Sequence, residues 1–310
     1  HRDLHSFPTR RSSDLQACRG IEVASGLSHL QKLEKALAEK EKALGKAQKQ
    51  VESQRNALAE ISQMADHVLE QADKIWHKGF TFVKEASYTC GPYRNTVKEF
   101  RHDLTGMEFV YIPGGTFQMA SNYKVTLSPY LIAKYPCTQA EWQTIMGDNP
   151  SNLNEDRYPV ERVSWDDCRQ FCQKAGLALP TEAQWEFACR AGSSGQYCYG
   201  DGESQLGEYA WYEGNSGNQT YSVGEKKPNA FGLYDVHGNV WEWCQDWYGD
   251  YEGKDAVDPK GAPNGSRRVG RGGCWGNFAA YVRCATRSSD SPENRYDYLG
   301  CRCALAPQKK

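Results

Sequence analysis

Cysteine is the residue type with the widest chemistry in this chain, and its twelve cysteines are unevenly spread. Ten of them lie between Cys137 and Cys303. Pairs of thiols form disulfides and thiolates bind soft metal ions, so the cluster predicts disulfides, a metal site or both. The alternative is a set of buried free thiols. Because so many cysteines are rare in cytosolic proteins, we expect an extracytoplasmic or cell-surface location.

A second candidate functional region is the segment of residues 271–304, in which anchor residues alternate with short runs of polar and aromatic residues. Its anchors are glycine, tryptophan, proline and arginine, from Arg271 and Trp275 to Arg302. The runs between them are rich in tyrosine, serine, asparagine and aspartate, which is the composition of a ligand-binding surface. The alternative is an exposed loop, since the same polar residues dominate turns. The predicted ligand-binding residues are Asn277, Phe278, Tyr281, Ser288, Asp290, Tyr296, Asp297 and Tyr298.

Composition narrows the classes of function. The net charge of the 310 residues is −2, which provides no positive surface for a nucleic acid. The mean hydropathy is −0.75, and no run approaches the roughly 18 apolar residues of a membrane span. The nine tryptophans and 18 tyrosines favour a folded domain over disorder. We therefore expect neither a nucleic-acid partner nor a membrane-spanning segment.

A heptad repeat predicts a long coiled-coil helix over residues 26–76. Apolar residues alternate at spacings of three and four, which keeps them on one face of a helix. Lys40 and Gln54 lie on the same face of the helix, among the core positions of the repeat. Polar residues at such positions can fix the register in which the helices of a coiled coil pair. The pattern predicts self-association, and the alternative is a single amphipathic helix packed on the following domain. The best-preserved seam position is occupied by Leu30, Leu37, Leu44, Val51 and Leu58.

The rest of the chain divides into three further parts. Residues 1–15 have no apolar core and no pattern that continues downstream, so we interpret them as a non-native leader. Residues 77–105 contain Gly91 and Pro92 as structure breakers and are expected to be a linker. Residues 106–306 are expected to form the folded domain.

Within this domain, capping patterns locate the helices. Thr138, Ser164 and Thr181 are each followed three positions later by an acidic or amide residue, as at the start of a helix. They predict helices over residues 138–146, 164–175 and 181–189, after a strand at 107–113. Beyond residue 192 the sequence predicts loops and short strands. The fold class is therefore expected to be a loop-rich α+β domain.

Seven segments of the predicted domain carry a family pattern. In chain order they read GMEFVYIPGGTFQM, YPVERVSWDDCRQFC, LPTEAQWEFACRAG, YAWYEGNSG, PNAFGLYDVHGNVWEWCQDW, RGGCW and LGCRCA. With these segments the chain resembles the formylglycine-generating enzyme (sulfatase-modifying factor) family. The resemblance implies a variant of the C-type-lectin fold. It also implies copper- and oxygen-dependent oxidation of a sulfatase cysteine to formylglycine.

The sequence departs from the family where the chemistry would take place. The family's catalytic form has two cysteines between the Gly-Gly-aromatic turn and the Arg-x-Ala segment, and soft thiolates suit Cu(I). The corresponding residues in this chain, 276–282, contain no cysteine. An oxidase would need Cys274 and Cys301 as a substitute pair, with copper as the cofactor. We therefore expect no catalytic residue and keep copper for this alternative only.

Residues 275–302 also resemble the terminal segment of variable proteins from diversity-generating retroelements. The shared frame runs from Trp275 through Arg283, Arg287 and Pro292 to Arg302. Together with the missing cysteine pair, it predicts a non-catalytic protein of bacterial or phage type that binds a protein or glycan surface. The coiled coil would add avidity by bringing several domains together. The alternatives are the copper-dependent oxidase and a structural rod-and-cap component of a phage or cell envelope.

The family resemblance also implies a calcium site. Asp235 and Glu242 would supply carboxylates, while Gly238 and Val240 would supply backbone carbonyl oxygens, and calcium prefers oxygen ligands. The alternative is a hydrogen-bonded turn without a metal. A second family calcium site is not expected, because Ala210 stands where an oxygen side chain would be needed.

The resemblance implies two disulfides, Cys172–Cys303 and Cys189–Cys284. Each would close a long loop and join a helix to the terminal segment, with a stabilisation of about 2–4 kcal/mol. Cys168 lies one helical turn before Cys172, and Cys301 lies two residues before Cys303 on an expected strand. Each therefore shares a face with a cysteine of the first pair, which suggests a third bridge, Cys168–Cys301. Free buried thiols stay the alternative for all of them.

Overall fold

The computed structural model describes residues 12–76, 78–119, 123–251 and 253–305. The chain divides into two units, His1–Gln71 and Ala72–Lys310. Residues 1–11 of the predicted leader lie outside the described residues, and Ser12 already begins a helix. No helix in the described ranges is both long enough and apolar enough to cross a membrane.

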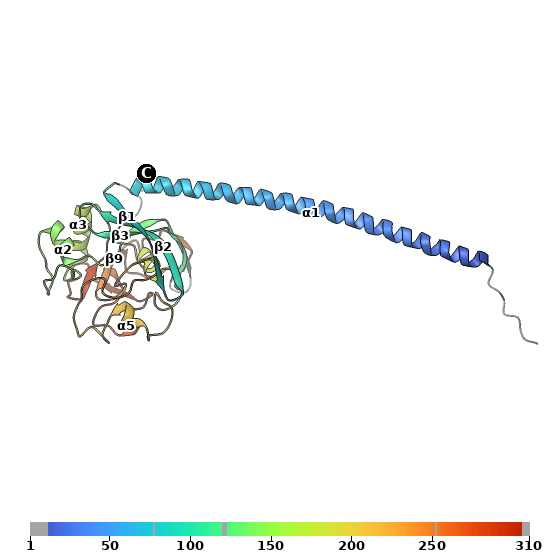
Figure 1. Ribbon diagram of the computed structural model, residues 1–310. Helices are drawn as coiled ribbons and strands as arrows, with labels where there is room; N and C mark the ends of the chain where they lie inside the picture. Colours follow the sequence, from blue (N-terminus) through green and yellow to red (C-terminus); the bar gives the residue numbers. More distant parts are fainter. Residues whose placement is uncertain (1–11, 77, 120–122, 252, 306–310) are drawn as a thin grey trace, which may run out of the picture. The chain divides into compact units, whose positions relative to one another are not determined.

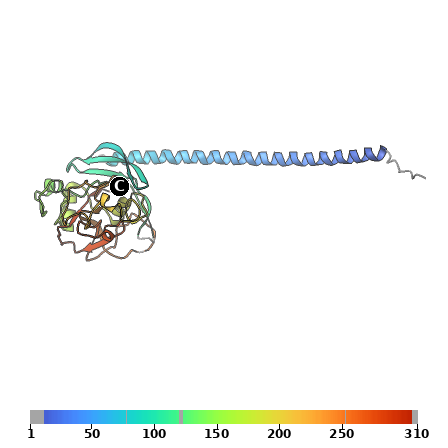
Figure 2. The same ribbon diagram turned by 60° about the horizontal axis from the view of Figure 1, so that its bottom comes forward.

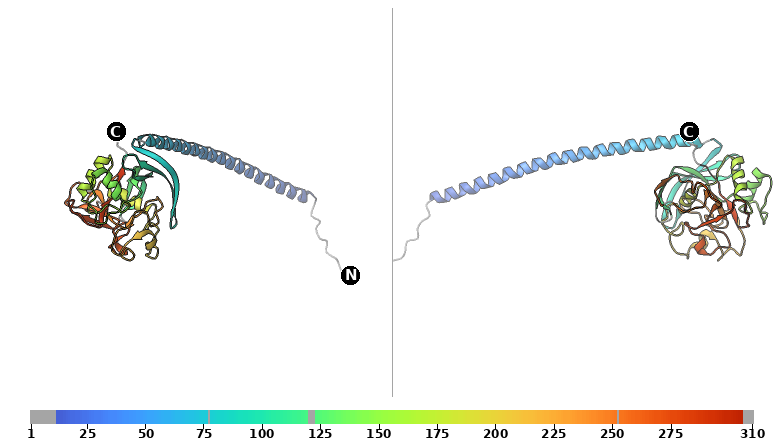
Figure 3. Two further views of the ribbon diagram at one scale, coloured as in Figure 1. Left: turned by 60° about the vertical axis from the view of Figure 1, so that its left-hand side comes forward. Right: turned by 180° about the vertical axis from the view of Figure 1, so that it is seen from behind.

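The N-terminal unit is built on one long helix. The helix α1 spans Ser12–Trp76 and is drawn as an unbroken ribbon in every view (Figures 1, 2 and 3). Its charged, glutamine and alanine residues are strong helix formers, which explains its length. The leucines of the heptad repeat are exposed in the single chain, at 60% for Leu30 and 59% for Leu37. The helix is therefore present as predicted, whereas its pairing into a coiled coil stays a prediction.

The predicted linker is wrong for most of its length, because residues 80–102 form a β-hairpin. The strands β1 (Phe80–Cys90) and β2 (Tyr93–His102) pair antiparallel from Phe80 opposite His102 to Cys90 opposite Tyr93. Gly91 and Pro92, which suggested breaks in a linker, are the two turn residues. Gly91 has a φ of 55°, a conformation that glycine adopts readily. The domain therefore begins before residue 106.

The hairpin is the edge of a five-stranded sheet in the order β1-β2-β3-β6-β14. The strands β3 (Glu108–Ile112), β6 (Tyr130–Ala133) and β14 (Ala304–Leu305) complete it. Nearly all residues of β3 and β6 are buried, so this sheet forms one side of the core. A separate sheet of β4 (Gly115–Met119), β5 (Tyr123–Leu127) and β10 (Ala256–Val257) lies in the same domain.

The three predicted helices are confirmed as α2 (Gln139–Met146), α3 (Trp165–Ala175) and α4 (Glu182–Arg190). Each begins with a capping box, in which the Thr138, Ser164 or Thr181 side chain accepts from a backbone N–H three residues on. The rings of Trp142 and Phe171 stack with centroids 5.1 Å apart and hold α2 against α3. Local sequence signals thus located the helices correctly.

The predicted binding segment belongs to a four-stranded sheet in the order β12-β11-β9-β13. Its strands are β9 (Trp241–Trp247), β11 (Arg268–Arg271), β12 (Arg287–Asp290) and β13 (Leu299–Cys301). The domain also contains short elements, namely α5 (Leu206–Tyr209), β7 (Ala210–Trp211), β8 (His237–Gly238) and the 3-10 helix η1 (Ala279–Tyr281). The domain is a mixed α and β fold with short sheets and many loops, as expected.

Candidate functional site

The site is a pocket on the predicted binding segment. Its volume is about 530 Å³, and its walls come from β9, β11, β12 and the loops next to them. Four predicted ligand-binding residues line it: Asn277, Ser288, Asp290 and Tyr298. The other lining residues are Asn218, Trp241, Trp243, Gly270, Cys274, Trp275, Gly276, Ser289 and Leu299. Residues far apart in the sequence thus converge on a cavity of ligand size.

A stacked pair of tyrosines lies at the site, and of the two only Tyr298 lines the pocket. The rings of Tyr296 and Tyr298 lie parallel, with centroids 5.0 Å apart and planes within 4°. The hydroxyl of Tyr296 also accepts a hydrogen bond from the Asn294 side chain at 3.1 Å. Burial raises the pKa of Tyr298, so its hydroxyl stays protonated at neutral pH. The pair gives a fixed aromatic surface with hydrogen-bonding hydroxyls.

The remaining predicted residues lie outside the pocket lining. Phe278 and Tyr281 are exposed at 63% and 54%, which is high for aromatic side chains. Asp297 is half-buried, and its backbone carbonyl accepts from Trp275 Nε1 at 3.3 Å. The predicted surface therefore consists of a pocket with two exposed aromatic side chains on the same chain segment.

Sequence reasoning missed the part that tryptophans play in the pocket. Trp241, Trp243 and Trp275 are not among the predicted ligand-binding residues, and Trp243 is only 1% exposed. All three also line the cavity. Positions 241 and 243 alternate along β9 and therefore lie on one face of the strand. That spacing was the signal that could have placed both on the site.

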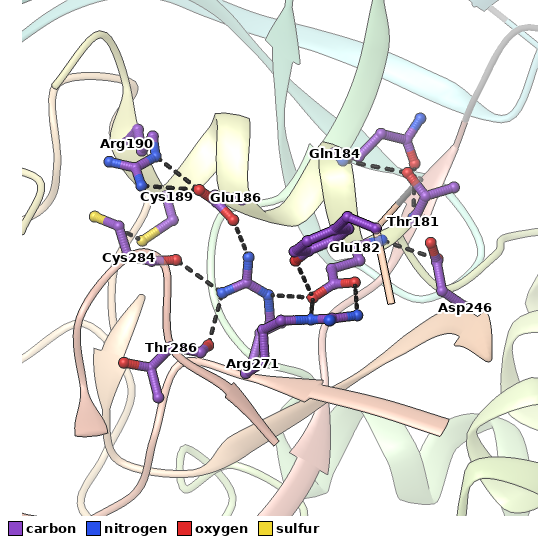
Figure 4. Close-up of polar contacts among 12 residues, drawn as sticks. Thr181, Glu182, Gln184, Glu186, Cys189, Arg190, Asp246, Arg271, Cys284 and Thr286 are labelled. Atoms are coloured by element: carbon purple, nitrogen blue, oxygen red, sulfur yellow. Dashed lines mark hydrogen bonds and ion pairs between the residues drawn. The ribbon is translucent and has the colours of Figure 1, made fainter. Parts of the chain in front are cut away.

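A buried charge network holds two of the strands that line the pocket, β11 and β12 (Figure 4). Arg271, which is fully buried on β11, donates to the carbonyl oxygens of Cys284 and Thr286 at 2.8 and 2.6 Å and pairs with Glu186. Arg287 on β12 forms two hydrogen bonds with the Glu182 carboxylate, at 2.6 and 2.8 Å. Because both glutamates belong to α4, the helix holds two strands of the binding sheet. Removing one partner of such a buried pair costs about 3–5 kcal/mol.

The predicted disulfide partners lie together as buried thiols. The sulfur atoms of Cys172 and Cys303 are 3.7 Å apart, and those of Cys189 and Cys284 are 3.6 Å apart. Each pair joins a helix to the terminal segment, as expected. Disulfide bonding itself stays a prediction.

The suggested third bridge has no unique partner. Cys301 forms hydrogen bonds with both Cys137 and Cys168, and these lower the pKa of Cys301 to about 5. The three thiols form one buried group, so Cys168 and Cys301 are not an isolated pair.

The pocket does not fit a copper-dependent oxidase. Cys274 lines the cavity, and burial raises the pKa of its thiol to about 11, so the thiol is protonated at neutral pH when no metal is bound. Cys301, the other half of the substitute pair, is turned toward Cys137 and Cys168 instead. The lining therefore contains one thiol, whereas the resemblance implies a pair of cysteines for the oxidase chemistry.

One group of metal-ligand side chains is present among the described residues. The ligand atoms of Cys189, His237 and Cys284 lie within 4.8 Å of one another, and all three residues are buried. Both nitrogens of His237 are already engaged. Nε2 lies 3.1 Å from the Cys198 backbone N–H, and Nδ1 lies 2.7 Å from the Val282 carbonyl oxygen. We assign no metal to this group.

The predicted calcium turn uses its carboxylates for protein contacts. Glu242 is fully buried and accepts three hydrogen bonds from Arg302, at 2.8 to 3.2 Å. Asp235 accepts from the Gly224 backbone N–H at 2.8 Å, and burial raises its pKa to about 6. Gly238 and Val240 are buried in the same turn. A guanidinium on Glu242 leaves little negative charge for calcium, so these residues do not fit the ion as arranged.

Comparisons with known proteins place this site in a family. Residues 94–307 match the model of the sulfatase-modifying factor enzyme 1-like domain, beginning within β2. The formylglycine-generating enzyme of Bos taurus is 35% identical over 185 residues, which cover 54% of this chain and 50% of that protein. The chain thus spans about half the length of the curated relatives it matches.

Two solved structures have the same fold. Variable protein 1 of Treponema denticola is 32% identical, with a TM-score of 0.59 over 73% of this chain and 100% of that one. PvdO from Pseudomonas aeruginosa is 26% identical, with a TM-score of 0.60 over 67% of this chain and 97% of that one. The family match and the shared fold agree with the seven sequence segments. The chain belongs to the sulfatase-modifying factor enzyme 1-like family.

Proposed function

We propose that this chain is a non-catalytic protein that binds a protein or glycan surface through the pocket on residues 271–304. The observation that carries the proposal is the pocket itself. Aromatic and polar side chains line it together with a single thiol, and burial raises the pKa of that thiol. Such a lining recognises a ligand but lacks the thiol pair of the family's oxidase chemistry.

The contacts in the pocket suit recognition of a surface ligand. The Tyr298 ring offers an apolar face with a hydroxyl, a combination that is common at binding interfaces. Asp290 is oriented by the Ser291 backbone N–H and the Asn294 amide, at 2.8 and 2.6 Å. Preorganised side chains lose less conformational entropy on binding. The exposed rings of Phe278 and Tyr281 would extend the contact beyond the pocket.

The likeness to a variable protein supports this proposal. The Treponema denticola variable protein 1 is covered over its whole length. In this chain, Arg271 and Arg287 are tied to α4, whereas Ser288 and Asp290 face the pocket. The alternation of anchored and pocket-facing positions is what a scaffold with a changeable surface requires.

The proposal includes self-association through α1. The exposed leucine stripe would be buried in a coiled coil, and association would raise the effective concentration of the binding domains. Analytical ultracentrifugation of the full chain should show an oligomer. Replacing Leu37 and Leu44 by lysine should yield monomers, while the same replacements at Glu41 and Gln48, outside the seam, should not. A monomeric wild type would refute this part of the proposal.

Binding is tested with two defined probes, a glycan array and a phage-displayed peptide library. The wild type should retain members of one probe set saturably. Tyr298→Ala should weaken that binding at least about tenfold, as expected for a central aromatic contact. Val257→Ala, at a residue that is 72% exposed on β10, serves as the control and should bind normally. Equal retention by the wild type and Tyr298→Ala would contradict the proposal, as would retention of neither probe set.

The oxidase alternative has its own assay. The chain is incubated with copper, oxygen and a sulfatase-derived cysteine peptide, and the peptide is examined for formylglycine by mass spectrometry. We expect no product. Product that disappears in Cys274→Ala would replace the binding proposal with the oxidase. Ordered filaments without any ligand binding would instead favour the envelope component.

A further inference from the structure

The hairpin β1-β2 has one deeply buried end. β1 is the edge strand of its sheet, and most of its residues are exposed. Cys90, the last residue of β1, is 0% exposed. A fully buried cysteine at the tip of an exposed edge strand implies that the hairpin tip is covered by another part of the domain.

The covering part is the loop that follows α4. Cys198 in this loop is also 0% exposed, and its sulfur lies 3.4 Å from that of Cys90, across 108 positions of sequence. A Cβ atom added at Gly91 would lie 2.4 Å from the Tyr199 carbonyl oxygen. Glycine is therefore required at this point of the hairpin turn. The tip of the hairpin therefore contacts the loop at two successive positions, Cys90 and Gly91.

Other contacts hold the hairpin in the same place. The Asn95 side chain donates to the Ala191 carbonyl oxygen at 3.1 Å. Glu99 on β2, which is 2% exposed, pairs with Lys134 at 3.0 Å. These contacts keep the two sulfurs adjacent without any covalent bond, so the geometry for a bond is already present in the reduced protein.

We propose that Cys90 and Cys198 form a disulfide that fastens the hairpin to the domain. The two thiols lose two protons and two electrons as the S–S bond forms. The oxidant is a small-molecule disulfide, such as oxidised glutathione, which is reduced to two thiols. Closing the gap from 3.4 Å to the bond length of about 2.05 Å requires only a small movement of the side chains.

The surroundings of Cys90 favour the exchange. Its hydrogen bond with Cys198 lowers the pKa of the Cys90 thiol, and the thiolate is the form that attacks a disulfide. Both sulfurs are buried once the hairpin is docked, so the oxidant must react as the hairpin docks or while it is transiently open. Once formed, the bond would close a long loop and oppose peeling of the edge strand. Because α1 precedes β1 in the chain, any load on the helix would reach the domain through this fastened hairpin.

Peptide mapping tests the proposal on the full-length wild type. The protein is equilibrated with oxidised glutathione, alkylated under denaturing conditions and digested with trypsin without reduction. Cleavage after Lys84 and Arg94 isolates Cys90, and cleavage after Arg190 and Lys226 isolates Cys198 as the single cysteine of its peptide. We expect these two peptides to be joined. Alkylated Cys90 and Cys198, or a bond from either to another cysteine, would overturn the proposal.

Stability gives a second readout. The oxidised wild type should melt roughly 5–15 °C above the form lacking this bond. In Cys90→Ala, Cys198→Ala and the double variant, oxidation should raise the melting temperature less than in the wild type. The reduction should be the same in all three, because each variant lacks the same bond. Cys244→Ala is the matched control, since Cys244 is equally buried on β9. It should retain the full response to oxidation. Non-equivalent effects of the two single variants would contradict the bond, and wild-type peptide mapping decides the question if a variant fails to fold.

Discussion

Two regions that the sequence predicted as functional use their polar atoms in different ways. In the turn of residues 235–242, the carboxylates of Asp235 and Glu242 are satisfied by protein donors. On residues 271–304, Arg287 is likewise paired with a carboxylate of the protein, but Ser288 and Asp290 face a cavity. A family motif can therefore preserve the residues of a site while the protein itself occupies their hydrogen-bonding groups. Only the second region has side chains left to meet a ligand.

The largest expected effect on stability is that of a substitution in the turn of residues 235–242. Glu242→Ala leaves the buried Arg302 guanidinium without its carboxylate, so we expect a loss of about 3–5 kcal/mol in the free energy of unfolding. Urea denaturation measures the loss. Glu242→Gln retains a hydrogen-bond acceptor of the same shape and should lose less. If both variants are as stable as the wild type, the turn does not depend on this pair. A chelator that lowers the wild-type melting temperature would show that calcium occupies the turn in solution.

A smaller effect on stability is expected at Asp246, which accepts a hydrogen bond at 2.9 Å from the backbone N–H of Glu182 in the buried charge network. Burial raises the pKa of Asp246 to about 7, above the value of about 3.9 in an unfolded chain. The folded state then binds more protons between these values, so this carboxyl stabilises the fold at low pH and the contribution is lost as pH rises through 7. We expect stability to fall by about 1–3 kcal/mol between pH 4 and pH 8 from this group. Asp246→Asn should flatten the pH profile measured by urea denaturation, and an unchanged profile would contradict the assignment.

Local signals accounted for much of this architecture. The capping boxes at Thr138, Ser164 and Thr181 depend on side chains three positions apart, which can be read directly from the sequence. The hairpin was missed because Gly91-Pro92 suggests a break equally well in a linker and in a two-residue turn. Choosing between them requires knowing that β2 pairs with β3, a tertiary contact.

The site was predictable in part. The alternation of anchors and polar runs predicted a ligand-binding surface, and four of its residues, Asn277, Ser288, Asp290 and Tyr298, line the pocket. It did not separate them from Phe278 and Tyr281, which lie outside the lining. The closeness of Cys90 and Cys198 was also beyond the sequence, since it results from docking the hairpin on a distant loop.

Substitutions in the pocket lining should lower the affinity for a ligand more than they lower the free energy of unfolding. Asp290→Ala removes an oriented carboxylate from the lining, and we expect at least a tenfold loss of affinity for the array glycan or displayed peptide that the wild type retains. Tenfold corresponds to about 1.4 kcal/mol. Asp290→Asn separates charge from hydrogen bonding, since it retains an oxygen acceptor for the Ser291 N–H. Wild-type affinity in both variants would remove Asp290 from the site.

The smallest effect on stability is expected at the exposed aromatic residues. Phe278 and Tyr281 are more than half exposed, so alanine at either position should change the free energy of unfolding by less than about 0.5 kcal/mol. If they extend the ligand contact, the affinity for the retained probe should nevertheless fall by about three- to tenfold. Thermal melting and probe binding on the same samples separate the two quantities. A loss of stability without a loss of affinity would assign these rings to the fold, and the binding surface would then end at the pocket.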